Sequence, residues 1–230
     1  MKSPIILALD TKDLAEANSW IAATKESISI YKVGLELFLR IGIDGTRKLA
    51  SEGIEIFLDL KLHDIPNTVG QAVSSVSELN PRFLTVHASG GSEMIAAAVQ
   101  NAKNTSITAV TILTSLNDAD LQEIGYQKGS LESAVSLAKL AVSAGATSIV
   151  CSPFEVGAIR KSVPDSIELI TPGVRPLDSE LGDQKRATTP KEAIGNGANF
   201  VVIGRPITSF AKESLVAMRE RAADLSAQLV

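Results

Sequence analysis

The chain contains little of what several classes of functional site require. Its 230 residues include one cysteine, Cys151, and two histidines, His63 and His87. A single cysteine excludes an internal disulfide framework and suits a reducing compartment, so a cytoplasmic protein is expected. Two histidines exclude a zinc site built from three, and neither His-Glu-x-x-His nor Cys-x-x-Cys occurs in the sequence. No metal site is predicted.

Long hydrophobic runs and an excess of positive charge are missing as well. No apolar run approaches the ~20 residues that a membrane-spanning helix needs. The 22 basic and 26 acidic residues give a net charge of −4, whereas proteins that bind nucleic acid usually present a basic face. We therefore expect neither a membrane nor nucleic acid as a partner. An anionic small molecule is compatible with this composition, because a local cluster of Lys and Arg can outweigh a mild global charge.

Short apolar runs rich in β-branched residues alternate with amphipathic stretches from one end of the chain to the other. The expected strands lie near 5–10, 28–34, 54–61, 82–88, 106–114, 147–152, 167–174 and 200–205. The expected helices lie near 12–25, 35–52, 67–79, 91–102, 130–144, 154–161, 189–196 and 210–227. About eight strand–helix units in this length predict an α/β protein with one domain, a (β/α)8 barrel over residues 1–230.

A doubly wound open sheet is the alternative fold. It would favour a Gly-rich phosphate turn after the first strand, but that strand runs into Leu9-Asp10-Thr11-Lys12 instead. Two connections lack a clear pattern. Residues 115–129 are irregular, with room for a short helix. Residues 175–188 form a long polar loop. Such a loop in a barrel with few insertions is usually functional, so we predict a lid that closes over a phosphate.

Residues 57–64, Phe-Leu-Asp-Leu-Lys-Leu-His-Asp, place three charged groups in a strand-like apolar stretch. Alternation along a strand puts Asp59 and Lys61 on one face, and Asp64 follows at the turn before the next helix. Two carboxylates and an ammonium group in a poorly hydrated place are costly unless they are paired or used. The pattern predicts a catalytic cluster. A buried structural ion network is the alternative interpretation.

Active sites of such barrels lie at the carboxyl ends of the strands. Asp10 ends the first expected strand and Lys32 lies in the second, and both face the same way as Asp59 and Lys61, which predicts an alternating array of Lys and Asp. The ends of the last two strands predict a phosphate site, because glycines at 173 and 204 let the backbone approach and a guanidinium can grip two phosphate oxygens. The other candidate residues at strand ends are His87, Thr114, Arg175, Gly204 and Arg205. His87, Thr114, Gly204 and Arg205 can also be ordinary strand ends or packing residues.

Two other chemistries fit the cluster less well. Asp59 and Asp64 could bind Mg²⁺, but Lys61 between them would compete for the same negative charge. A Schiff base at Lys61 needs a lowered lysine pKa, and flanking carboxylates shift that pKa upward.

The run Asp-Leu-Lys-Leu-His-Asp-Ile-Pro-Asn-Thr at 59–68 closely resembles the signature of the orotidine 5′-phosphate decarboxylase family. Other segments match that family in order along the chain, in a form similar to its bacterial branch. These segments are Leu9-Asp10, Tyr31-Lys32-Val33-Gly34, Val86-His87-Ala88, Leu113-Thr114-Ser115, Thr171-Pro172-Gly173-Val174-Arg175-Pro176, Asp183-Gln184 and Ile203-Gly204-Arg205-Pro206.

The resemblance implies conversion of orotidine 5′-monophosphate to UMP and CO₂, without a metal or an organic cofactor. It implies that Lys61 donates a proton to C6 and that Asp59 lies beside the departing carboxylate. It also implies a homodimer in which Asp64 and Thr68 reach the neighbouring site. The substrate-binding residues implied are Asp10 and Lys32 for the ribose, Thr114 for the pyrimidine, and Arg175, Gln184, Gly204 and Arg205 for the phosphate.

Two competing functions share parts of this pattern. Related Mg²⁺-dependent decarboxylases or synthases of phosphosugars resemble the chain in Asp-x-Lys-x-x-Asp, but not in the following Ile-Pro-Asn-Thr. A catalytically silent nucleotide-binding barrel would be expected to lack Lys61 or another charged member of the array, and this chain retains them all.

Overall fold

The predicted apolar runs form eight parallel strands that close into a barrel in the order of the sequence, with the last strand pairing with the first. The computed structural model describes residues 3–176 and 188–229. The strands are β1 (Ile5–Ala8), β2 (Ile30–Gly34), β3 (Glu55–Leu62), β4 (Phe83–His87), β5 (Ser106–Val110), β6 (Ser148–Val150), β7 (Glu168–Thr171) and β8 (Phe200–Ile203). The barrel prediction is confirmed, and the open-sheet alternative is wrong.

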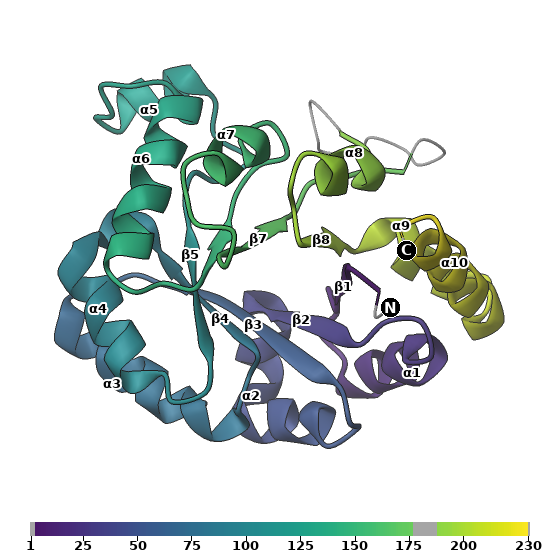
Figure 1. Ribbon diagram of the computed structural model, residues 1–230. Coiled ribbons are helices and arrows are strands. Elements are labelled where there is room, and N and C mark those ends of the chain that lie inside the picture. Colours follow the sequence, from purple (N-terminus) through teal and green to yellow (C-terminus); the bar gives the residue numbers. More distant parts are fainter. Residues whose placement is uncertain (1–2, 177–187, 230) are drawn as a thin grey trace.

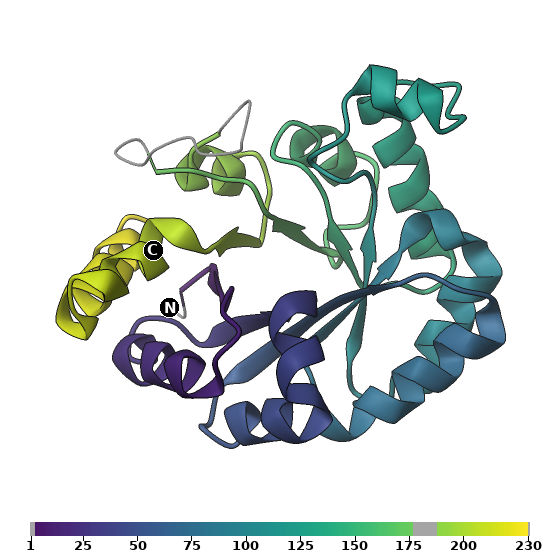
Figure 2. The ribbon, with the colours of Figure 1, turned by 180° about the vertical axis from the view of Figure 1, so that it is seen from behind.

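Helices cover the outside of the barrel, as Figures 1 and 2 show from opposite sides. They are α1 (Leu14–Thr24), α2 (Leu35–Ala50), α3 (Pro66–Val76), α4 (Gly91–Asn101), α5 (Asp118–Glu123), α6 (Ser130–Ser143), α7 (Val156–Arg160), α8 (Pro190–Gly195), α9 (Arg205–Thr208) and α10 (Leu215–Ala227). Short 3₁₀ turns are η1 (Ser77–Leu79), η2 (Ala88–Gly90) and η3 (Ser209–Lys212). The first and last described segments lie close together, and the Ser3 hydroxyl donates a hydrogen bond to Ser226 over 3.0 Å.

Every strand is buried on both faces, which explains why the sequence shows continuous apolar runs rather than strict alternation. The inward side chains form one core inside the barrel. Its members are Ile6, Ala8, Ile30, Phe57, Phe83, Val110, Val150, Ile170 and Val202. The outward side chains form a larger core against the helices, in which small residues such as Ala98, Ala134 and Ala138 let each helix approach the sheet.

Several elements are shorter than the sequence predicts. The strand expected at 167–174 ends at Thr171, because Pro172 has no N–H for the sheet ladder. The strand expected at 106–114 ends at Val110. The last long helix begins at Leu215 rather than near 210, because the side chain of Ser214 caps it by accepting from the Ala217 N–H. The irregular connection at 115–129 contains the short helix α5, whose amino terminus is capped by a capping box of Asn117 and Asp120.

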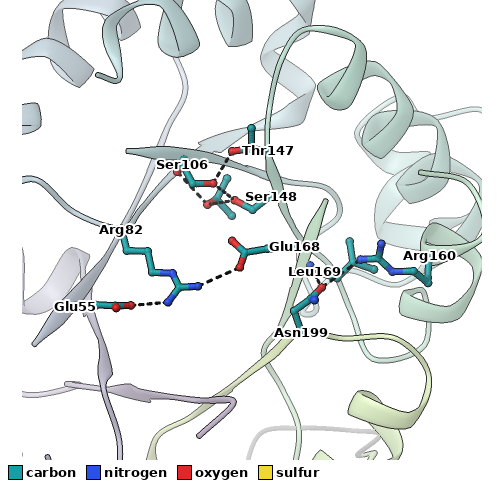
Figure 3. Close-up of polar contacts among 10 residues, drawn as sticks. Glu55, Arg82, Ser106, Thr147, Ser148, Arg160, Glu168, Leu169 and Asn199 are labelled. Carbon is teal, nitrogen blue, oxygen red and sulfur yellow. Dashed lines mark hydrogen bonds and ion pairs between the residues drawn. The ribbon is translucent and has the colours of Figure 1, made fainter. Parts of the chain in front are cut away.

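The amino-terminal mouth of the barrel is closed by a paired cation, shown in Figure 3. Arg82, just before β4, bonds to Glu55 at 2.5 Å and to Glu168 at 3.1 Å. Its guanidinium also lies about 5 Å above the rings of Phe83 (5.0 Å) and Phe200 (4.9 Å). The three charged side chains are each about one-third exposed, so this network is partly shielded from water.

We predict that Arg82→Ala destabilises the fold by about 2 kcal/mol. The substitution leaves two half-buried carboxylates facing each other without their cation. Removing one partner of a fully buried ion pair would cost more, because water would screen the remaining charge less. Urea unfolding measures the change through the transition midpoint. The matched control is Lys128→Ala, which removes an exposed i,i+4 pair with Glu132 and should cost less than about 0.5 kcal/mol. Equal midpoints for the two variants would contradict the assigned role.

Candidate active site

Four charged side chains meet at the carboxyl-terminal mouth of the barrel, at the opposite ends of the strands from Arg82. Asp10 follows β1, Lys32 lies in β2, and Asp59 and Lys61 lie in β3. The Lys61 Nζ donates to both carboxylate oxygens of Asp59, at 2.8 and 2.9 Å. The Lys32 Nζ lies 3.1 Å from Asp10 Oδ1 and 3.9 Å from Asp59 Oδ2. The charges therefore alternate along the series Asp10, Lys32, Asp59, Lys61, which we call the charge array.

The middle of the charge array is shielded from water and its ends are open. The side chains of Asp59 and Lys32 are 12% and 14% exposed, compared with 31% for Lys61 and 57% for Asp10. Buried charges are tolerated when each has a partner of opposite sign, as these do. The array therefore holds fixed charges in a place where water weakens them little.

The backbone leaves regular strand geometry at Lys61. Its φ is 49°, a left-handed value that costs a side-chain-bearing residue about 1 kcal/mol or more. The pairing register between β3 and β4 also shifts between Leu58 and Leu62. The regular alternation expected across 57–64 is thus broken within the cluster, and this bulge, rather than the strand period, directs Lys61 toward Asp59.

A pocket adjoins the charge array. Its polar side is formed by Lys32, Asp59 and Lys61, with Thr114 also lining it. The remaining wall is apolar and consists of Phe57, Val110, Ile112, Leu113, Val150, Cys151, Pro172 and Val202. A flat ring bearing charged substituents on one edge would match these two kinds of wall.

Two glycines leave room for the charge array. A Cβ at Gly34 would lie 2.8 Å from the Lys32 Nζ, closer than real contacts allow. A Cβ at Gly204 would lie 3.3 Å from Asp10 Oδ2, which is a tight contact. Gly204 thus brings the end of β8 against the end of β1.

Asp64 and Thr68 lie apart from the pocket of their own chain. Both are exposed, Asp64 in the loop after β3 and Thr68 in the first turns of α3. The Asp64 carboxylate accepts a hydrogen bond from the N–H of Ile65 at 2.7 Å. The structure therefore does not bring these two residues into the charge array of the same chain.

The predicted phosphate residues are described only in part. Arg205 is exposed as the first residue of α9, directly after Gly204. Arg175 is half-buried, and its backbone N–H donates to the Thr188 carbonyl at 3.0 Å. Gln184 and residues 177–187 of the predicted lid lie outside the described residues.

Thr85 is a residue of the site that the sequence pattern did not reveal. It is fully buried in β4, accepts from the Lys61 N–H at 2.8 Å and donates to Asp59 Oδ1 at 3.0 Å. It occupies the same inward face as Phe83 and His87. That alternation was the available signal, but a β-branched residue in a strand usually reflects strand propensity alone.

His87 borders the charge array at the end of β4. Its ring lies 5.3 Å from that of His63, and it is half-buried. Burial lowers the pKa of His87, and the nearby His63 and Lys61 lower it further, against the opposing effect of Asp59. His87 is therefore neutral near pH 7 and adds no charge to the array.

Cys151 and Glu155 are buried beside the pocket. Burial raises the pKa of the Cys151 thiol, so it lacks the thiolate character of a nucleophile. Burial also raises the pKa of Glu155 to about 7, although the Ser152 N–H donates to its carboxylate at 3.1 Å.

Comparison with known proteins identifies the family. A model described as "Orotidine 5'-phosphate decarboxylase / HUMPS family" matches residues 3–220. The chain belongs to this family. It is 49% identical over 214 residues to orotidine 5'-phosphate decarboxylase of Thermobifida fusca, covering 90% of each chain. It is 44% identical over 244 residues to the protein of that name from Frankia casuarinae, covering 98% of this chain and 89% of the other.

A solved structure shows the same likeness. The crystal structure of orotidine 5'-phosphate decarboxylase from Lactobacillus acidophilus superposes with a TM-score of 0.83 at 36% identity. The match covers 97% of this chain and 98% of that one. The family membership predicted from the motif at 59–68 is thereby confirmed.

Neither a membrane-spanning helix nor a metal cluster is found among the described residues. Within residues 3–176 and 188–229, no helix is both long enough and apolar enough to cross a membrane. Over the same ranges, no three His, Cys, Asp or Glu side chains gather in a way that could hold a metal ion.

We predict that Glu155 lowers the free energy of unfolding between pH 4 and 7. An unfolded glutamate titrates near pH ~4.3, whereas the folded one holds its proton to about pH 7. As pH rises through this window the unfolded state ionises first, so the folded state loses relative stability. The loss is on the order of 4 kcal/mol and levels off about one pH unit above the folded pKa.

Urea unfolding of wild type and Glu155→Gln from pH 4 to 8 checks this prediction. The amide oxygen of Gln can still accept from the Ser152 N–H, but Gln does not titrate. The stability of the variant relative to wild type should therefore increase from pH 4 to 7. Glu213→Gln, an exposed residue, is the control. Parallel pH curves for wild type and Glu155→Gln would rule out the buried carboxyl as the cause.

Proposed function

We propose that the protein decarboxylates orotidine 5′-monophosphate to UMP and CO₂, the last step of de novo pyrimidine nucleotide synthesis, without a metal or organic cofactor. The observation that carries the proposal is the charge array at the barrel mouth, in a chain of this family. Its relatives at 49% and 44% identity bear the name of this activity. We propose that it works in the cytoplasm.

The chemistry explains why fixed charges are needed. Breaking the bond between C6 and the carboxylate releases CO₂ and leaves an electron pair on C6, which the pyrimidine ring cannot readily delocalise. An ammonium group already in place stabilises that charge without reorganising during the reaction. The Lys61 Nζ then donates its proton to C6, which forms UMP, and Lys61 regains a proton from solvent.

The other members of the charge array support Lys61. Asp59 holds the Lys61 ammonium in place with both carboxylate oxygens. In the proposed complex Asp59 also lies beside the departing carboxylate. Lys32 joins Asp59 to Asp10, and we assign Asp10 and Lys32 to the ribose hydroxyls.

The pocket and the last two strand ends accommodate the rest of the nucleotide. The pyrimidine ring lies against the apolar wall, where Thr114 can hydrogen-bond its polar edge. We assign the phosphate to Arg175, Gln184, Gly204 and Arg205. The phosphate is remote from the bond that breaks, but its binding energy can drive closure of the loop at 175–188 and order the site.

A Mg²⁺-dependent reaction on a phosphosugar is the second candidate, because decarboxylases and synthases of that kind share the Asp-x-Lys-x-x-Asp pattern found at 59–64. The Ile-Pro-Asn-Thr segment at 65–68 and the names of the relatives favour the nucleotide. Loss of the ultraviolet absorption of orotidylate on adding the protein, unchanged by EDTA, distinguishes the two.

We predict that Lys61→Ala lowers kcat at least ~100-fold, since both the stabilising charge and the proton donor are lost. Affinity for UMP should remain measurable because the phosphate and ribose contacts are intact. Orotidylate absorbance measures turnover, and calorimetric titration measures UMP binding. Lys12→Ala is the control, since Lys12 is 77% exposed near the same mouth and pairs with Glu36. A Lys61→Ala variant that retains a tenth of wild-type kcat would remove Lys61 from the chemistry.

We further propose that two copies assemble around this mouth and exchange Asp64 and Thr68. Apolar side chains are exposed on the same side: Leu35 and Leu39 at 49% and 79% in α2, and Ile65 at 65% before α3. Asp64 lies next to Ile65, so burying Ile65 against a second copy would carry the carboxylate toward that copy. A two-fold interface of this kind completes both pockets at once.

Mixed dimers test the shared site. Lys61→Ala and Asp64→Ala are each expected to be nearly inactive alone. After dissociation, equal mixing and reassociation, random pairing makes about half of the dimers mixed, and one pocket of each mixed dimer is intact. About a quarter of wild-type activity should return. If mass measurement confirms exchange and activity stays at the parental level, Asp64 serves its own chain.

A further inference from the structure

The pairing between β3 and β4 contains a break that a single side chain bridges. Leu58 pairs with Leu84 and Leu62 pairs with Val86. Residues 59–61 of β3 therefore lie opposite one residue of β4, Thr85. The bulged segment contains both Asp59 and Lys61, so whatever holds this segment also sets the geometry of the charge array.

The Thr85 hydroxyl takes the place of the missing ladder bond. Its Oγ1 accepts from the backbone N–H of Lys61 at 2.8 Å, at the residue whose φ is 49°. The same hydroxyl donates its proton to Asp59 Oδ1 at 3.0 Å. One fully buried group thus fixes the backbone of Lys61 and the carboxylate that Lys61 holds.

Without Thr85, the Lys61 N–H and Asp59 Oδ1 have poor alternative hydrogen-bond partners. Without the hydroxyl, the Lys61 N–H faces a neighbouring strand whose ladder is out of register there. Asp59 Oδ1 would then keep the Lys61 ammonium but lose its second hydrogen bond. A left-handed backbone at a lysine persists only where its surroundings hold it, so the segment would be free to relax.

We propose that Thr85 is a positioning residue for the reaction, acting through the backbone of Lys61 and the carboxylate of Asp59. This inference rests on the proposed role of the charge array. Thr85 has no direct contact with the nucleotide in this proposal, so its loss changes the placement of the Lys61 ammonium and leaves the phosphate and ribose contacts in place.

The test compares the hydroxyl with groups of similar shape. Thr85→Val replaces the hydroxyl with a methyl group and should lower kcat on the order of 10–100-fold, with KM and UMP affinity changed less than about 3-fold. Thr85→Ser keeps the hydroxyl and should retain kcat within about 3-fold of wild type. If Thr85→Val does not fold, Thr85→Ala against Thr85→Ser gives the same comparison, since those two differ by the hydroxyl alone.

The neighbouring strand offers a matched control. Thr108 pairs with Thr85 in the register of β4 and β5, is also fully buried, and bonds to Ser148 rather than to the charge array. Thr108→Val should lower the unfolding midpoint as Thr85→Val does, but retain kcat. Amide hydrogen exchange at Lys61 should accelerate in Thr85→Val and stay at the wild-type rate in Thr108→Val.

The outcomes separate this inference from the proposed function. Reduced kcat in Thr85→Val, rescued by Ser and absent in Thr108→Val, supports it. Equal losses in both valine variants, failure of Ser to rescue, or an unchanged kcat in Thr85→Val overturns it. If Lys61→Ala is inactive while Thr85→Val is fully active, the positioning role alone is lost. If Lys61→Ala is active, the charge array itself is not the catalytic group.

Discussion

The buried carboxylate of Asp59 is the group on which the site depends. It accepts two bonds from the Lys61 ammonium and one from Thr85, and it lies 3.9 Å from the Lys32 Nζ. Those partners come from β2, β3 and β4, so the geometry of three strands converges on one group. A carboxylate with so little exposure is stable only while these partners stay, and this need in turn orders both lysines.

The charged side chains at the two mouths of the barrel are held by different backbone geometries. At the amino-terminal mouth, Arg82 is held by Glu55 and Glu168 and lies over two aromatic rings, in a regular register. At the other mouth, a bulge and a left-handed lysine backbone hold the charge array. The first arrangement gains stability, whereas the second gives up some of it to aim an ammonium group into the pocket.

The sequence predicted the barrel because strands buried on both faces must be apolar throughout and must alternate with helices. It also placed Asp10, Lys32, Asp59 and Lys61 together, since charged residues at the inward ends of apolar strands are costly unless they pair with one another. It could not predict the bulge at Lys61, because positive φ is a property of the backbone and lysine carries no signal for it. Thr85 was missed for a related reason: a β-branched residue suits any strand, and only the broken register shows that its hydroxyl replaces a ladder bond. The predicted bounds were too long at the end of β7, which stops before Pro172, and at the start of α10, which begins only after its cap at Ser214.

The proposed role of Asp64 depends on a second copy of the chain. Within the chain, the charge array contains two lysines and two aspartates, and its formal charges sum to zero. In the proposed reaction the substrate brings another carboxylate to this array. When CO₂ leaves, the negative charge passes to C6, where the Lys61 ammonium would stabilise it and neutralise it by donating a proton. In the proposed dimer, Asp64 of the second copy adds one more negative charge, which attracts the ammonium groups of Lys32 and Lys61 and stabilises them further. Assembly would then set the electrostatics of the pocket before the nucleotide arrives, and an isolated chain would keep the fold and the lysines but lack the charge balance that the reaction uses.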